Sequence, residues 1–176
     1  MTAAGCAPAC KRTFHGEKSV TFSLKRLTLD EMNRAAVVLR TSFNERLSWL
    51  ADIHTPEEDT AFFRNHVFLT SEVWGAVDRD IIGIIAFRPG WIDQFYVMPD
   101  HQRQGVGGAL LRVAMQQHAN LSLWTFQRNM PARRFYEAKG FVAVDRTDGS
   151  ANEEREPDIL YRWDRPSKNC QSENSN

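Results

Sequence analysis

Hydrophobic residues recur along the chain with two different periods, and the period separates predicted strands from predicted helices. Alternating, β-branched or aromatic runs predict strands over residues 20–27, 72–77, 81–87, 91–98, 121–126, 141–146 and 158–163. Apolar positions three or four apart predict helices after residue 31, in a short piece over 43–50, from 55 to before 70, and over 106–117 and 129–139. The order β-α-α-β-β-β-α-β-α-β-β predicts an α/β fold on a mixed sheet, in which strands 72–98 form an antiparallel meander.

Local signals mark the ends of these elements. Thr28-Leu-Asp-Glu31 and Thr55-Pro-Glu-Glu58 have the capping-box form, in which a hydroxyl and a carboxylate serve the free amides of a first helical turn. Gly140 ends the last helix. The patterned region contains no repeat and no long linker, so we expect one domain over 19–164 between disordered tails, 1–18 and 165–176.

Composition and charge narrow the classes of protein. The chain has 176 residues, of which 42% are hydrophobic, and 22 Lys and Arg balance 22 Asp and Glu, so the formal net charge is zero. Without a basic field we expect no nucleic-acid partner and no anionic membrane. The longest apolar run, 81–87, is far shorter than the ~20 residues that span a bilayer, and the N-terminus lacks the apolar segment of a secretory signal. We therefore expect a cytoplasmic protein.

The three cysteines carry no expected chemistry. Cys6, Cys10 and Cys170 lie in the predicted tails, and their spacing matches no zinc site. We therefore predict neither a bound metal nor a covalent acyl-cysteine.

A glycine-rich loop carries the strongest chemical signal. Residues 97–108 lead from a predicted strand into a predicted helix, where glycines and free amides favour binding of a phosphate or pyrophosphate. No Lys-Ser or Lys-Thr follows the glycines, which excludes a P-loop, and no third glycine lies in register for a dinucleotide fold.

Two motifs in this region resemble those of the GNAT superfamily of N-acyltransferases. The first is Gln102-x-x-Gly105-x-Gly107, preceded by Val97-x-Pro99. The second is Asn129-x-x-Ala132-x-x-x-Tyr136-x-x-x-Gly140-Phe141, and the resemblance covers roughly residues 20–163. It implies a single α/β domain with a mixed, mostly antiparallel sheet, flanked by helices, whose central parallel strands, 91–97 and 121–126, splay apart.

The resemblance also implies acetyl-CoA as cosubstrate. The pantetheine arm would lie between the splayed strands, and loop 103–108 would hold the pyrophosphate. The cofactor-binding residues implied are Tyr96, Val97, Gln102, Arg103, Gln104, Gly105, Val106, Gly107, Gly108, Asn129, Ala132 and Tyr136.

Catalytic roles follow from the same resemblance. Tyr136 would lie near the thioester sulfur, where a phenol can protonate the departing thiolate or donate a hydrogen bond to it. A main-chain N–H near Tyr96 or Val97 would stabilise the carbonyl oxygen. The base that accepts the proton of the amine stays open among Asp93, His54, Glu58 and relay through water.

The acceptor is expected to be a primary amine of a small or amino-acid-like molecule, attacked directly in a ternary complex. Aromatic candidates for its pocket are Phe43, Trp49, Trp91 and Trp124, and the acidic loop 148–157 could attract a cation. The alternatives are acetylation of protein N-termini or lysines, and a non-catalytic acyl-CoA sensor. A homodimer is a further candidate assembly, since proteins of this superfamily often pair.

Overall fold

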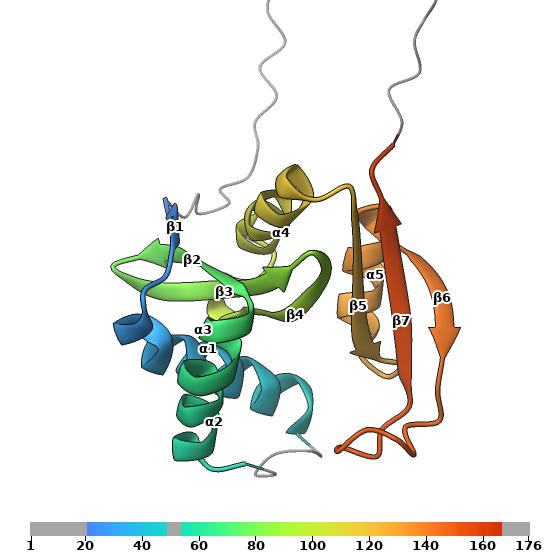
Figure 1. Ribbon diagram of the computed structural model, residues 1–176, viewed down its shortest axis with the longest axis horizontal. Coiled ribbons are helices and arrows are strands. Elements are labelled where there is room, and N and C mark those ends of the chain that lie inside the picture. Colours follow the sequence, from blue (N-terminus) through green and yellow to red (C-terminus); the bar gives the residue numbers. More distant parts are fainter. Residues whose placement is uncertain (1–20, 49–53, 167–176) are drawn as a thin grey trace, which may run out of the picture.

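A seven-stranded mixed sheet organises the computed structural model, which describes residues 21–48 and 54–166 (Figure 1). The strand order is β1-β2-β3-β4-β5-β7-β6, and every neighbouring pair is antiparallel except β4 and β5. The strands are β1 Ser23–Arg26, β2 Glu72–Asp78, β3 Asp80–Arg88, β4 Gly90–Val97, β5 Asn120–Phe126, β6 Val142–Arg146 and β7 Asp158–Asp164. The predicted mixed sheet with one parallel pair is confirmed.

The parallel pair is joined only at its beginning. Gly90 pairs with Leu121 and Trp91 with Ser122, and the strands then diverge. Beyond this point β4 is paired on its other side with β3, and β5 with β7. Figure 1 shows the result as two half-sheets that separate between β4 and β5. The predicted splay is therefore present.

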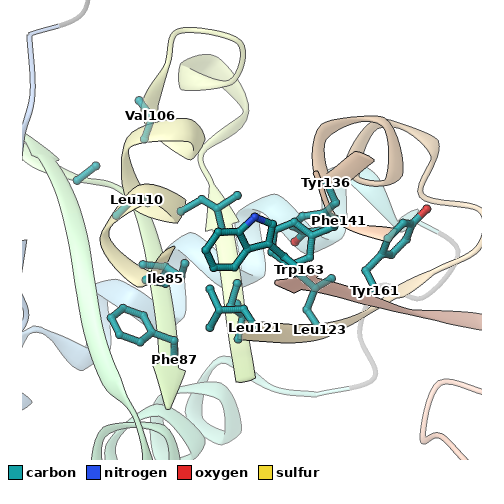
Figure 2. Close-up of a cluster of buried hydrophobic side chains, with 14 of the residues drawn as sticks. Ile85, Phe87, Val106, Leu110, Leu121, Leu123, Tyr136, Phe141, Tyr161 and Trp163 are labelled. Atoms are coloured by element: carbon teal, nitrogen blue, oxygen red, sulfur yellow. The ribbon is translucent and has the colours of Figure 1, made fainter. Parts of the chain in front are cut away.

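Helices cover both faces of the first half-sheet, and the last helix lies against the second half-sheet (Figure 1). They are α1 Met32–Arg46, α2 Pro56–Phe62, the π-helical turn η3 Phe63–Val67, α3 Phe68–Thr70, α4 Val106–Gln117 and α5 Met130–Ala138, with short 3-10 turns at Leu29–Glu31 and Pro99–His101. Because strand side chains alternate between faces, Ile84 packs with α1 and η3, whereas Ile85 and Phe87 pack with α4. Figure 2 shows the cluster on the α4 side, which includes Leu110 of α4 and Trp163 of β7.

One predicted element is wrong. The chain over 43–46 is the last turn of α1 rather than the start of a separate helix over 43–50, and Leu47 N–H still donates to Phe43 O at 2.7 Å. Ser42 explains the continuity, since it is buried and its hydroxyl donates to Val97 O at 3.0 Å. Residues 49–50 lie outside the described part of the chain.

The chain beyond β7 is anchored at its start. The Arg165 N–H donates to Ala119 O at 2.7 Å, and its guanidinium donates to the carbonyl oxygens of Met115, Gln116 and His118 at 2.9 Å each. Residue 165, at the predicted beginning of the C-terminal tail, therefore caps the end of α4. Most of the two predicted tails lies outside the described residues. No helix in the described ranges is long and apolar enough to cross a membrane.

Candidate active site

The diverging strands β4 and β5 are two walls of a cleft of about 950 Å³, which the loop before α4, helix α5 and the end of α1 complete. This cleft brings together most of the candidate site residues, from the two motifs and from the candidate bases. Those that line it are Asp93, Tyr96, Val97, Gln102, Arg103, Gly105, Gly107, Gly108, Asn129, Ala132 and Tyr136. The two motifs, separate in the sequence, therefore face one cavity.

Four of the candidate residues do not line this cleft: Gln104, Val106, His54 and Glu58. The Gln104 side chain donates to Asp100 O at 2.6 Å within the loop. Val106 is buried in the core, where its side chain packs against the backbone of Gly83. His54 lies at a second, smaller pocket described below. The side chains of Gln104 and Val106 thus contribute to the loop and its packing.

The glycine-rich loop presents free amides to the cleft. Gly105 is the N-cap of α4 and has φ of +88°, a left-handed conformation that glycine adopts without strain. The first α-helical bond runs from Ala109 N–H to Gly105 O at 3.0 Å. The amides of residues 106–108 precede that bond, so they remain available to an anion at the positive end of the helix dipole.

Lys139 adds a cation at the same place. A Cβ atom on Gly108 would lie 3.6 Å from Lys139 Nζ, and this ammonium is also 5.9 Å from the centre of the Phe135 ring. Lys139 is not among the residues predicted from the sequence. Its position was detectable, because it follows Phe135 by four residues, a spacing that places two side chains next to each other at the end of α5.

Gln102 joins three parts of the site. Its side-chain N–H donates to Val97 O at 3.0 Å, the same oxygen that accepts from Ser42, and its side-chain oxygen accepts from Arg46. The motif glutamine therefore fixes the loop to the end of β4 and to α1.

Tyr136 lies at the inner end of the cleft. Its side chain is only 7% exposed, and its ring lies 5.5 Å from Phe135, 5.6 Å from Phe141 and 6.1 Å from Tyr161, centre to centre (Figure 2). Within the described residues its hydroxyl makes no hydrogen bond. Burial raises the pKa of Tyr136 above that of an ordinary tyrosine, and the nearby Tyr96 raises it further. The phenol therefore keeps its proton at neutral pH and can act as a donor.

Asn129 begins the helix that carries Tyr136. Its side-chain oxygen accepts from Ala132 N–H at 3.3 Å, which makes it the N-cap of α5, and it also lines the cleft. The small Ala132 leaves space one turn before Tyr136.

Two of the candidate bases have other partners. The Asp93 carboxylate is paired with Arg88 Nε at 3.1 Å and accepts from the Ser71 hydroxyl at 2.8 Å. The Glu58 carboxylate accepts from Thr55 N–H at 2.7 Å, and this bond lowers the pKa of Glu58 below its ordinary range. Both groups are engaged in local structure.

A second pocket of about 270 Å³ adjoins the cleft on the side of α1 and α2. His54 and Glu58 line it together with the ion pair of Arg40 and Asp59, whose closest atoms are 2.6 Å apart. Further lining residues are Leu39, Phe43, Asn44, Phe62, Gln94, Tyr96, Glu153 and Glu154. Phe43, Tyr96 and Glu154 also line the large cleft, so the two spaces meet at these side chains.

The aromatic residues predicted for an acceptor pocket lie in different places. Phe43 lines both spaces, and Trp124 lines the large cleft while 43% exposed. Trp91 lines neither; the Arg88 guanidinium lies 5.8 Å from its ring centre. Trp49 is outside the described residues. Among residues 21–48 and 54–166, no three His, Cys, Asp or Glu side chains are grouped to hold a metal ion.

Comparison with known proteins identifies similar sequences and folds. Residues 69–143 match the family model of the acetyltransferase (GNAT) domain. The peptidyl-lysine N-acetyltransferase YiaC of Escherichia coli (strain K12) is 36% identical over 69 residues, which cover 39% of this chain and 47% of the relative. The chain therefore spans about half the length of this curated relative.

Solved structures share the fold at low sequence identity. The apo form of YjaB from Escherichia coli superposes with a TM-score of 0.69 at 19% identity, covering 84% of this chain and 100% of YjaB. NAA60 from Arabidopsis thaliana, solved in complex with acetyl-CoA, superposes with a TM-score of 0.64 at 17% identity, covering 82% of this chain and 98% of NAA60. Residues 69–143 are therefore similar to the GNAT acetyltransferase domain, and the chain shares its fold with these solved structures.

Proposed function

We propose that the protein is an acetyl-CoA-dependent N-acetyltransferase that transfers the acetyl group to a primary amine by direct attack in a ternary complex. One observation carries this proposal: the splayed strands, the free amides of α4 and the buried Tyr136 all face a single cleft. The GNAT domain and the acetyl-CoA complex of the structural neighbour NAA60 support the same cosubstrate.

The cleft offers a separate partner for each part of acetyl-CoA. The facing edges of β4 and β5 are unpaired beyond Trp91 and Ser122, so an extended pantetheine arm can bond to them as a strand would. The amides of residues 106–108 suit the pyrophosphate, with Arg103 and Lys139 as nearby cations.

Two groups of the chain would stabilise the reaction. Negative charge develops on the thioester oxygen as the amine attacks, and a main-chain N–H near Tyr96 or Val97 would donate to it. The thiolate then leaves, and the Tyr136 phenol would donate to the sulfur. Because burial raises the pKa of Tyr136, we assign it first the role of hydrogen-bond donor.

A small or amino-acid-like amine fits the acceptor side best. The second pocket, at about 270 Å³, is below the usual size of a pocket for a drug-sized ligand. Lysine in a peptide is the second candidate, because the relative YiaC is named a peptidyl-lysine N-acetyltransferase.

Release of free thiol from acetyl-CoA tests the proposal. The assay uses a panel of small primary amines and lysine peptides, a protein blank for Cys6, Cys10 and Cys170, and calorimetric CoA binding in parallel. Release that requires a small amine supports the proposal, and release with peptides alone moves the acceptor to protein lysine. Well-folded protein that does not bind CoA would overturn it.

A further inference from the structure

We propose that Glu154, on the loop between β6 and β7, receives the ammonium group of the acceptor at the junction of the two cavities. This inference rests on the proposed function and identifies the charged group that selects the acceptor. Three residues line both cavities, Phe43, Tyr96 and Glu154, and Glu154 is the charged one.

The loop brings Glu154 across to the first half of the molecule. It joins β6 to β7 in the second half-sheet, yet it extends toward α1 and α2 (Figure 1). Next to Glu154, the Glu153 carboxylate lies 3.6 Å from His54 Nε2. This contact places the loop beside the start of α2. Asn152 holds the loop from within, since its amide donates to Glu156 O at 2.8 Å and to the Asp158 carboxylate at 3.2 Å.

The neighbouring carboxylates are already engaged. Asp59 is paired with Arg40, Glu58 caps Thr55, and Glu153 faces His54. Glu154 makes neither a hydrogen bond nor an ion pair with the described parts of the chain. Its charge is therefore available to a cation that reaches the junction.

The Tyr96 hydroxyl lies near the negative charges at the junction of the two cavities. Burial raises the pKa of Tyr96, and the negative charges of Glu154 and then Asp59 raise it further. Both carboxylates are thus close enough to act on a group at the entrance to the cleft.

The walls of the second pocket indicate the rest of the acceptor. Leu39, Phe43 and Phe62 contribute apolar surface on the side of α1 and α2. A cation held by Glu154 would have this surface behind it. The geometry therefore suits a primary amine on an apolar body, such as an aralkylamine.

The proton balance is simple. The acceptor enters as an ammonium and releases one proton to solvent beside Glu154. The free amine then forms a C–N bond with the thioester carbonyl carbon, and the C–S bond breaks. The nitrogen loses a second proton and the thiolate gains one, so the products are an amide, CoA thiol and one released proton.

Binding of matched probes to protein saturated with CoA tests this assignment. The probes are phenethylamine, which is cationic at neutral pH, and its neutral counterpart 2-phenylethanol. Glu154→Gln keeps the shape of the side chain and removes the charge. We expect this variant to bind phenethylamine about tenfold or more weaker, with the alcohol and CoA bound as in the original protein. Glu57→Gln makes the same change in net charge on the exposed first turn of α2 and should alter none of these affinities.

The binding results separate the proposed function from the role of Glu154. Failure of the original protein to bind CoA would overturn the proposed function. If CoA binds and phenethylamine does not, or if phenethylamine binds equally to the original protein and Glu154→Gln, the assignment of Glu154 is wrong. Retained CoA binding by Glu154→Gln also shows that the variant is folded.

Discussion

At the scale of single residues, Tyr136 is a buried side chain of the cleft whose hydroxyl makes no hydrogen bond within the described residues. Its ring is held by Phe135, Phe141 and Tyr161, so loss of the oxygen alone should leave the packing unchanged. We expect Tyr136→Phe to lower turnover ~100-fold or more, since proton donation to a leaving group contributes on that order. Calorimetry should give an unchanged CoA affinity. Unchanged turnover would remove Tyr136 from the mechanism.

The Lys139 ammonium is expected to contribute to binding of the pyrophosphate. Because its ammonium lies beside the first turn of α4, Lys139→Gln should weaken acetyl-CoA and make the remaining binding less sensitive to salt. The kcat/KM for S-acetyl-pantetheine, which lacks the pyrophosphate, should not change in this variant. Lys139→Arg should restore most of the affinity. Equal loss with both thioesters would show that Lys139 acts on the fold and not on the phosphates.

The sequence predicted part of this site at the residue scale. Glycines at a helix start and a tyrosine in a motif are local patterns, so Gly105, Gly107 and Tyr136 could be selected from spacing and resemblance. Lys139 was not selected, although its spacing of four residues from Phe135 was visible in the sequence. Glu154 had no such local signal, because the cavities that it lines are formed with distant parts of the chain. Gln102 shows the converse: its motif position was evident, but its bonds to β4 and α1 required the fold.

At the scale of elements, α5 depends on the cap at its first turn. Asn129→Ala removes the acceptor for Ala132 N–H, and we expect the free energy of unfolding to fall by about 1 kcal/mol in urea titrations. CoA should also bind more weakly, because α5 lines the cleft and Lys139 directly follows it. Thr55→Ala removes the cap of α2 instead, so it should cost similar stability and leave CoA affinity intact.

The elements themselves were largely predictable. The helix predicted over 106–117 has the bounds of α4, and the predicted strand meander matches β2 to β4 within a few residues. The error at 43–50 has a physical cause. Thr41 and Ser42 have low helix propensity, but the bond of Ser42 to Val97 compensates for it, and such a tertiary contact leaves no trace in local sequence.

At the scale of the whole molecule, the ligand should act as part of the sheet. The half-sheets share only two paired positions, so an extended arm between β4 and β5 would join them along their length. Acetyl-CoA at a hundredfold excess over its dissociation constant should add about 2.7 kcal/mol to the free energy of unfolding. Hydrogen exchange should slow along residues 92–97. If acetyl-CoA raises the free energy of unfolding but hydrogen exchange along residues 92–97 does not slow, the pantetheine arm does not bind between β4 and β5.

Three half-buried or buried tyrosines set the response to high pH. The pKa values of Tyr96, Tyr136 and Tyr161 are all raised in the folded protein, chiefly by burial. Their folded pKa values exceed the ordinary value near 10, so the unfolded chain ionises first. Their contribution to stability is fully present below pH 10 and is lost as the pH rises above it. Urea titrations from pH 8 to 11 should show this decline, with a smaller slope for Tyr136→Phe.

The overall arrangement was predictable only with the help of the family resemblance. Periodicity alone indicates a mixed sheet, whereas the point at which β4 and β5 part depends on the packing of both half-sheets. The approach of loop 148–157 to α1 and α2 had no local signal at all, because it joins segments about a hundred residues apart, such as His54 and Glu153.

The open edges of β4 and β5 have a practical consequence for handling the protein. Unpaired strand edges recruit foreign strands, and natural sheets usually cover, shorten or charge the edges that face outward. Here two such edges face each other inside the molecule, where an extended segment of another chain could take the place proposed for the thioester arm. Storage without ligand should therefore favour slow aggregation, and added CoA should keep the preparation monodisperse by occupying the gap.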